Sequence, residues 1–101
     1  MILVEGKTDK QALILAGLKK EDIICTYGTI SFERLEQLID ELEGMDVYFL
    51  FDEDDSGDRL RKKFIQAFPN GIIMRIPKEY KEVAETPVDI LKQILEKHYL
   101  I

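Results

Sequence analysis

The sequence predicts an α/β fold in which a four-stranded, mainly parallel sheet carries helices on both faces. Four short apolar runs alternate with four helical patterns, the order expected of a parallel sheet. The third run, residues 47–51 (VYFLF), is apolar without interruption, as is typical of a strand buried on both faces. The 101 residues contain no internal repeat and no linker, so we expect a single domain over residues 1–101.

The first third of the chain contains a predicted strand, a helix and a second strand. Residues 2–4 (ILV) form the first strand. A helix is expected over residues 9–18, because Thr8 and Gln11 have the spacing of a capping box. Residues 22–26 (DIICT) then form the second strand.

A second helix precedes the apolar run at residues 47–51. Ser31 is expected to cap its N-terminus, and Gly44 is expected to end it. Apolar side chains recur along it at helical spacing and predict its buried face: Leu35, Leu38, Ile39 and Leu42.

The last part of the chain repeats the alternation. A helix is expected over residues 56–68, and after a turn at residues 69–71 a fourth strand over residues 72–76. Thr86 is expected to cap a last helix with Pro87 at its first position. The side chains expected to face inward from these two helices are Leu60, Phe64, Phe68, Val88, Leu91, Leu95 and Tyr99.

Parallel sheets bind ligands beyond the carboxyl ends of their strands. This rule directs attention to the loops that follow the four predicted strands. They span residues 5–8, 27–29, 52–57 and 77–86.

The formal net charge of −6 is unevenly distributed. Residues 21–58 contain thirteen acidic residues and one basic residue, whereas residues 1–20 and 59–101 are both net basic. A sequence-independent nucleic-acid coat needs many Lys and Arg residues to neutralise phosphates, so the acidic balance argues against that class. It also predicts weak unaided affinity for nucleic acid, and we therefore expect a protein partner or a homodimer to supply further contacts.

The sequence also predicts where the protein works. No apolar run approaches the roughly 20 residues that span a bilayer, and no basic segment precedes the first apolar run. Cys25 is the only cysteine, so an internal disulfide is impossible. We therefore expect a cytoplasmic protein without a membrane partner.

Three acidic residues follow the first and third predicted strands. Glu5 lies after the first strand, and Asp52 and Asp54 lie after the third. At one sheet edge these carboxylates repel one another unless they are protonated, hydrated or neutralised by a cation. Mg²⁺ prefers carboxylate oxygens and is commonly shared with phosphate, so the pattern predicts a Mg²⁺ (or Mn²⁺) site.

Other interpretations of these loops are possible. A P-loop would need a glycine where Met1 stands, and a calcium loop would need a glutamate where Lys63 stands. An aspartyl-phosphate phosphatase carries its Asp-x-Asp motif on the first strand of a longer chain. An acidic turn that only hydrates a strand end and caps the helix beginning near Ser56 stays open as an alternative.

The motifs VEGKTD after the first strand and FDEDDSGD after the third resemble those of the Toprim family, over the whole chain. The family signature is a glutamate after the first strand and an Asp-x-Asp, followed by a glycine, after the third. Glu5, Asp52 and Asp54 match it, with Gly6 and Gly57 in support. The chain is most similar to small stand-alone Toprim proteins and to the Toprim domain of the 5S ribosomal RNA maturase.

The resemblance implies a Rossmann-like Toprim domain with a catalytic acidic site. Asp52 and Asp54 would coordinate Mg²⁺, and Glu5 would bind metal or act as general acid or base. The implied reaction is phosphodiester cleavage in nucleic acid, either RNA or DNA. The alternative is a non-catalytic module that binds metal, nucleotide or nucleic acid and works with a protein partner, as in recombination mediators.

Further residues are candidates for contacts with phosphate. Lys7, with Gly6 and Thr8 at the start of the first helix, is expected to contact phosphate, although a solvated lysine is an equally good interpretation. Tyr27 lies near the edge of the site, where packing is the expected role for an aromatic side chain. Four basic residues are interpreted as a solvated helix face rather than a nucleic-acid contact: Arg59, Arg61, Lys62 and Lys63. Three residues of the fourth loop could border the site: Lys78, Lys81 and Glu85.

Overall fold

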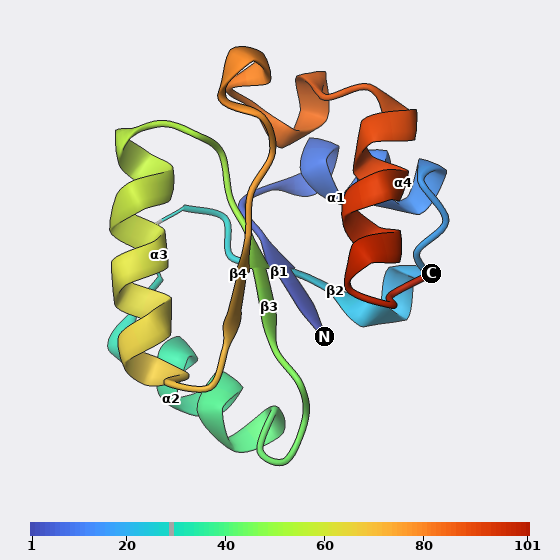
Figure 1. Ribbon diagram of the computed structural model, residues 1–101. Helices are drawn as coiled ribbons and strands as arrows, with labels where there is room; N and C mark the ends of the chain where they lie inside the picture. The colour runs from blue at the N-terminus through green and yellow to red at the C-terminus, as the bar shows by residue number, and fades with distance from the viewer. Residues whose placement is uncertain (29) are drawn as a thin grey trace.

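Four parallel strands form one sheet in the order β2-β1-β3-β4 (Figure 1). Ile2 of β1 pairs with Ile23 of β2 on one side and with Tyr48 of β3 on the other, and Tyr48 pairs in turn with Ile72 of β4. The computed structural model describes residues 1–28 and 30–101, so Thr29, in the predicted loop at 27–29, lies outside the described residues. The strands are β1 (Ile2–Val4), β2 (Ile23–Cys25), β3 (Tyr48–Leu50) and β4 (Ile72–Met74).

Helices cover both faces of this sheet, as the sequence predicts (Figure 1). Two helices lie on each face: α1 and α4 on one, α2 and α3 on the other. Three single turns of 3₁₀-helix join the longer elements: η1 (Lys20–Asp22), η2 (Lys78–Tyr80) and η3 (Val83–Glu85). The helices are α1 (Lys7–Leu15), α2 (Phe32–Glu41), α3 (Asp55–Ala67) and α4 (Val88–Lys97).

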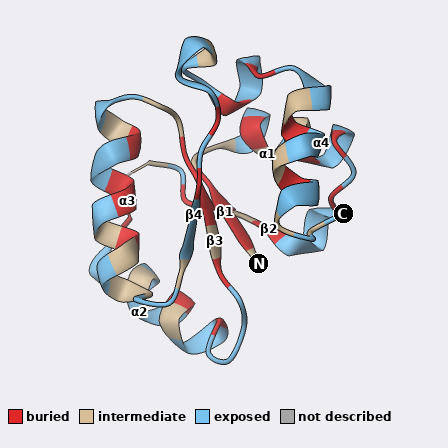
Figure 2. Ribbon diagram, viewed as in Figure 1, coloured by how far each residue is buried: buried red, intermediate tan, exposed pale blue. Residues whose placement is uncertain are grey.

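The apolar core is divided by the sheet into two clusters, visible as the red interior in Figure 2. Alternation along β1 explains the division, because Ile2 and Val4 enter the cluster under α1 and α4, whereas Leu3 enters the cluster under α2 and α3. Phe49 and Phe51 of the VYFLF run are fully buried with Phe64 of α3. The central strands are thus held on both faces, which fixes the positions of the loops that leave them.

The strand order creates a switch point between β1 and β3. The chain leaves β1 toward β2 on one side, whereas it leaves β3 toward β4 on the other side. The loops after these two neighbouring strands therefore diverge, and a crevice opens between their carboxyl ends. Within residues 1–28 and 30–101, no helix is long and apolar enough to cross a membrane.

One predicted helix start was wrong, and an acidic side chain explains it. Helix α1 begins at Lys7 rather than at residue 9, and the predicted capping box does not form because the Asp9 carboxylate accepts a hydrogen bond from the Gly6 N–H instead. Helix α3 begins at Asp55, one residue before the expected start, and Asp54 of the acidic turn is its cap. The predicted Ser31 cap of α2 is confirmed, since its hydroxyl accepts from the Arg34 N–H.

The ends of the first and last helices also differ from the prediction. Helix α1 stops at Leu15 because Gly17 adopts a positive φ of 117° that reverses the chain. The Thr86 hydroxyl donates to the Glu82 carbonyl instead of capping α4, whose N-cap is Pro87. Tyr99, predicted to face inward, is 93% exposed because α4 ends at Lys97 and the helical spacing ends with it; Val88 is also exposed.

Candidate functional site

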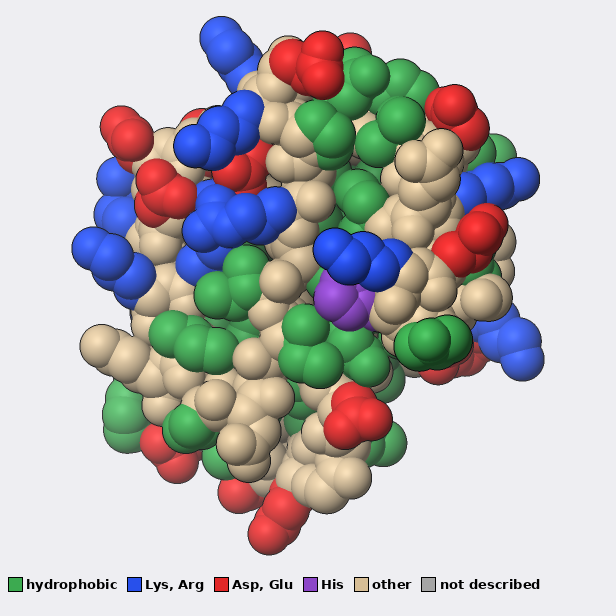
Figure 3. Space-filling model, in the orientation of Figure 1, with side chains coloured by type: hydrophobic (Ala, Val, Ile, Leu, Met, Phe, Trp, Pro, Cys, Tyr) green, Lys and Arg blue, Asp and Glu red, His purple; other side chains and the backbone are tan. Residues whose placement is uncertain are grey.

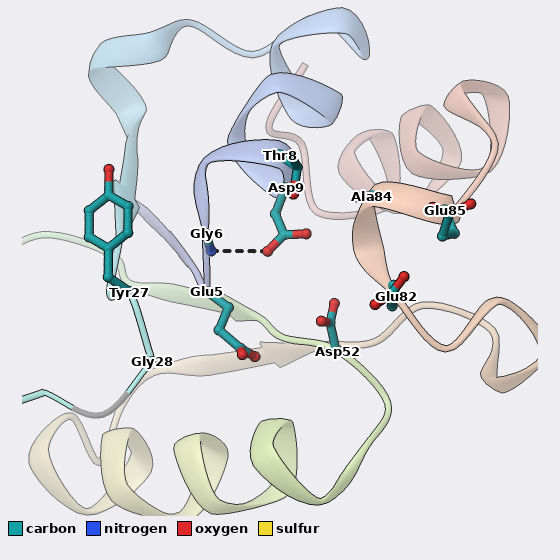
Figure 4. Close-up of a pocket in the computed structure, with 10 residues that line it drawn as sticks. All are labelled: Glu5, Gly6, Thr8, Asp9, Tyr27, Gly28, Asp52, Glu82, Ala84 and Glu85. Atoms are coloured by element: carbon teal, nitrogen blue, oxygen red, sulfur yellow. Dashed lines mark hydrogen bonds between the residues drawn. The ribbon is translucent and has the colours of Figure 1, made fainter.

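The crevice at the switch point is a pocket of about 560 Å³ with acidic walls (Figure 4). Glu5 enters it directly after β1, and Asp52 enters it from the loop after β3. The carboxylates of Glu5, Asp9 and Asp52 surround one space, with Glu82 beyond Asp52 and Tyr27 on the opposite side. The lining residues are Glu5, Gly6, Thr8, Asp9, Tyr27, Gly28, Asp52, Glu82, Ala84 and Glu85.

Glu5 carries the clearest sign of an unmet interaction. Its Oε1 atom is buried and has no hydrogen-bond partner among the residues that the structure describes. Burial raises the pKa of its carboxyl, and the negative charges of Asp52 and Asp54 raise it further, with the Ser56 hydroxyl acting in the opposite direction. A buried acceptor in a field of like charge favours a proton or a cation.

Asp52 joins the end of β3 to the loop that follows β4. Its Oδ1 accepts a hydrogen bond of 2.8 Å from the Val83 N–H, at the start of η3. Burial is the main reason that the pKa of Asp52 is raised, and the charge of Asp54 adds to it. The Val83 hydrogen bond and the Arg61 guanidinium lower that pKa, but they do not cancel the effect of burial.

Asp9 is a third pocket carboxylate that the sequence analysis treated only as a helix start. It is 6% exposed, and its Oδ2 accepts a hydrogen bond of 3.0 Å from the Gly6 N–H. Burial and the charge of Asp52 raise the pKa of Asp9 despite the backbone hydrogen bonds that it receives. The available signal was its place at the end of the VEGKTD motif, one helical turn after Glu5.

Asp54 lies at the border of the pocket rather than in its wall. Its side chain is at an exposed position, and its Oδ1 accepts a hydrogen bond of 2.7 Å from the Gly57 N–H as the N-cap of α3. It lines a neighbouring surface pocket that also contains Arg75 and Lys78. Its charge still raises the pKa of Glu5 and of Asp52. The capping interpretation of the acidic loop thus holds for Asp54, and its role as a metal ligand stays a prediction.

Gly57 lets the acidic loop pack against the first turn of α3. A Cβ atom at this position would overlap the carbonyl oxygen of Asp52. The glycine that follows the Asp-x-Asp motif therefore has a steric reason, because any side chain here would push Asp52 away from its place in the pocket.

Arg61 contradicts the interpretation of a solvated basic helix face. It is 4% exposed, and it donates to the carbonyl oxygens of Phe51 and Asp52 and to the Asp58 carboxylate. A further ion pair of 3.2 Å links it to Glu53. Arg59 and Lys62 are exposed, as expected, and basic side chains gather over α3 on the face shown in Figure 3.

The predicted phosphate-contacting residues do not all reach the pocket. Gly6 and Thr8 line it, but Lys7 is exposed and is not a lining residue. Glu85 lines it too, whereas Lys78 and Lys81 do not. Among the described lining residues there is no Lys or Arg, so the walls offer acceptors rather than cations.

The donor set fits one hard cation that retains much of its water. Within residues 1–28 and 30–101, no group of three His, Cys, Asp or Glu side chains is arranged as a metal site. Mg²⁺ is commonly held by one or two carboxylates plus waters and substrate phosphate. Glu5 and Asp52, with an unpartnered buried oxygen on Glu5, satisfy that smaller requirement.

Comparison with known proteins identifies the fold and this arrangement of loops. Residues 2–86 match the family model described as Toprim-like. The chain belongs to the Toprim-like family. The match includes both acidic loops, so Glu5 and Asp52 lie within the Toprim-like region of the chain.

Two further proteins are similar to this chain over most of its length. The chain is 42% identical over 95 residues to the uncharacterized protein YusF of Bacillus subtilis (strain 168), and the match covers 94% of this chain and 65% of YusF. The chain thus spans about two-thirds of the length of that relative. A solved structure of a small TOPRIM domain protein from Bacillus stearothermophilus is 46% identical, with a TM-score of 0.85 over 97% of this chain and 86% of that one.

Proposed function

We propose that Glu5 and Asp52 bind Mg²⁺, with Asp54 as a further ligand, and that the site assists phosphodiester cleavage in nucleic acid. The observation that carries the proposal is the buried, unpartnered Oε1 of Glu5 beside Asp52 at the switch point. Burial without a partner is costly for a carboxylate, so the site favours a ligand that supplies positive charge. Membership of the Toprim-like family supports the same assignment.

The chain's own residues would divide the work of cleavage. A bound Mg²⁺ would polarise the phosphodiester and stabilise the charge that develops on it. Glu5, which lines the same pocket, would take a proton from an attacking oxygen or return one to a leaving oxygen. Gly6 and Thr8, at the start of α1, provide the uncharged surface beside Glu5 where a phosphate group would lie.

A second candidate function is binding without catalysis. The specific observation in its favour is the acidic wall, since Asp9, Glu82 and Glu85 surround the site without a Lys or Arg among the described lining residues. Nucleic acid would then need its cationic contacts from a protein partner or a second copy of the chain. Metal binding is common to both candidates, and strand cleavage separates them.

Calorimetric titration with Mg²⁺ tests the metal site. The variant Asp52→Asn removes the charge but keeps an oxygen that accepts from the Val83 N–H, so the loop should stay in place. We expect Mg²⁺ affinity to fall at least about 10-fold, because one of the two charged ligands is lost. The matched control is Asp40→Asn, an exposed acid of α2, and it should bind as wild type does. Wild-type protein that binds no Mg²⁺ would show the proposal to be wrong.

Cleavage assays then distinguish the two candidates. Nuclease-free protein is incubated with single- and double-stranded RNA and DNA in the presence of Mg²⁺ or Mn²⁺. We expect products with wild type and none with Asp52→Asn. If both proteins leave every substrate intact while wild type still binds Mg²⁺, the non-catalytic module is the correct function.

A further inference from the structure

Tyr27 is an exposed aromatic residue at the rim of the acidic pocket. It is one of the residues that line the pocket, and it is 74% exposed. The expectation that Tyr27 packs against the protein is therefore wrong. Single exposed aromatic residues are common on protein surfaces. Tyr27 differs from Phe32 and Tyr99, which are also exposed, because it lines the pocket and they do not.

The backbone holds this ring in a conformation that tyrosine rarely adopts. Tyr27 has a φ of 55°, in the left-handed region. Tyr99 and Lys81 also have positive φ, but they lie next to the ends of α4 and η2, where such a residue stops a helix. Tyr27 lies at the end of a strand, so helix termination does not explain its conformation.

Hydrogen bonds continue past the end of β2 and fix the distance of Tyr27 from Glu5. The Thr26 N–H donates to the Val4 carbonyl (2.9 Å), and the Tyr27 N–H donates to the Glu5 carbonyl (2.7 Å). Adjacent strands lie about 4.8 Å apart, so the two residues are held as cross-strand neighbours. Tyr27 and Glu5 therefore line the same pocket from neighbouring strand ends, within the span of a short strand of nucleic acid.

The pocket has an uncharged side and an acidic side (Figure 4). Tyr27 lies with Gly6 and Gly28 on the uncharged side, whereas Glu82 and Glu85 lie on the opposite side. An uncharged planar group can bind beside Tyr27. An anion can approach the carboxylates only where a cation lies between them. A nucleobase joined to a metal-bound phosphate has both properties.

We infer that Tyr27 is a stacking platform for an unpaired base of single-stranded nucleic acid whose adjacent phosphate lies at Glu5 and Asp52. The inference rests on the proposed function, since the metal brings the phosphate to the acidic wall. Exposed aromatic rings bind single strands because every unstacked base presents a face to them. In an intact duplex the bases are already stacked on one another, so the ring selects single strands or frayed ends.

The absence of tryptophan from the chain provides a direct probe. In Tyr27→Trp the indole is the only tryptophan, and stacking on a base quenches its fluorescence. We expect quenching in Mg²⁺ by single-stranded oligonucleotides of about eight nucleotides, oligo(dT) and oligo(U) alike. An abasic strand with the same phosphates should leave the emission unchanged, as should a blunt duplex. Equal quenching by the abasic strand would overturn the inference.

Affinity measurements by the anisotropy of a labelled strand give the second arm. We expect Tyr27→Ala to bind the oligonucleotides at least about 5-fold more weakly in Mg²⁺, and Tyr27→Phe to bind as wild type, because the ring is kept. Tyr99→Ala is the matched control, an exposed tyrosine that also has a positive φ. Wild-type affinity in Tyr27→Ala, or no binding by wild type, would overturn the inference.

The two proposals can fail separately. If calorimetry detects Mg²⁺ binding but Tyr27→Ala has no effect on strand affinity, the metal site stands and base stacking is wrong. If wild type binds no Mg²⁺ but Tyr27→Ala still weakens strand binding and the abasic strand still fails to quench, the metal site and the placement of the phosphate at Glu5 and Asp52 are wrong, and only base stacking on Tyr27 stands.

Discussion

Two neighbouring acidic residues at the end of β3 have opposite surroundings. Asp52 faces the pocket with Glu5 and Asp9, and burial raises the pKa of all three carboxyls. Glu53, the next residue, has a side chain that is only 6% exposed, and it lies 3.2 Å from Arg61 and 3.1 Å from Arg75.

The difference separates acidic residues that pair with Arg61 or Arg75 from acidic residues of the pocket that have no Lys or Arg beside them among the described lining residues. Glu53 finds its counter-ions inside the chain, as does Asp58, which pairs with Arg61 at 2.7 Å. The pocket carboxylates accept backbone hydrogen bonds, but the described lining residues include no Lys or Arg to neutralise them. A group of buried carboxylates without a neighbouring cation in its pocket, beside a group that is paired with Arg61 and Arg75, is the pattern expected of a binding site.

The largest effect should come from breaking the group that is paired with Arg61. Arg61→Met removes the buried cation and leaves Glu53 with Arg75 alone, while the carbonyls of Phe51 and Asp52 lose a donor. We expect unfolding free energy to fall by about 3–5 kcal/mol, measured by urea denaturation.

The control for this loss is Arg34→Met, which removes an exposed pair with Glu41 on α2. It should cost less than about 1 kcal/mol. Equal losses in both variants would mean that the buried ion pairs add nothing to the stability of the acidic loop.

The next largest effect should come from displacing the acidic loop that follows β3. Gly57→Ala places a Cβ atom against the Asp52 carbonyl, and overpacking of this kind costs about 1–3 kcal/mol. We also expect weaker Mg²⁺ binding in calorimetry, because Asp52 must shift. Gln66→Ala, at an exposed position of the same helix, is the control and should change both quantities little.

Reducing the repulsion among the pocket carboxylates Glu5, Asp9 and Asp52 should stabilise the metal-free protein. Glu5→Gln removes one of several like charges, and in EDTA at neutral pH we expect Tm to rise by a few degrees, as for roughly 0.5–1 kcal/mol. Because the folded-state pKa of Glu5 is raised, its protonated form is favoured, and wild type regains this stability as pH falls through that pKa.

The difference in Tm between Glu5→Gln and wild type should therefore disappear as the pH falls. Added Mg²⁺ should reverse its sign at neutral pH, since the ion stabilises the protein that binds it. Thermal unfolding followed by circular dichroism between about pH 4 and pH 7 measures both trends. A variant less stable than wild type in EDTA would contradict the picture of unrelieved repulsion.

The smallest effect on Tm should come from Asp58. The contribution of Asp58 to stability should depend on pH in the opposite direction to that of Glu5. The Arg61 guanidinium lowers the pKa of Asp58, so the stability that Asp58 adds is present at neutral pH and is lost as pH falls through its folded-state pKa. Asp58→Asn should lower Tm slightly at neutral pH, and the difference from wild type should vanish in acid. A difference that grows on acidification would contradict this assignment.

Much of the fold could be predicted from local pattern. The VYFLF run, the spacing of Leu38 and Leu42, and the Ser31 cap depend on neighbours in sequence, and all three predictions are confirmed. The start of α1 and the exposure of Tyr99 could not be predicted in this way, since they depend on which of several competing caps forms and on where the last helix ends.

The sequence predicted that Glu5 and Asp52 lie together, because this follows from the order of the strands. In a parallel sheet, residues after neighbouring strands meet at one edge, so Glu5 and Asp52 could be placed together from topology. Asp9 was missed because its burial depends on the packing of α1 against the loop of Glu82 and Ala84. The position of Arg61 inside the protein was missed because a helical pattern gives the face of a residue but not the reach of its side chain.

By itself, the sequence determined the alternation of strands and helices and the acids that follow β1 and β3. Only the tertiary structure decided which acids are neutralised, because charge pairing depends on distances across elements far apart in the chain. Arg61 reaches back to Glu53, Val83 binds Asp52 from beyond β4, and the Glu5 Oε1 is left without a partner among the described residues. The proposed metal site rests on that unpartnered oxygen.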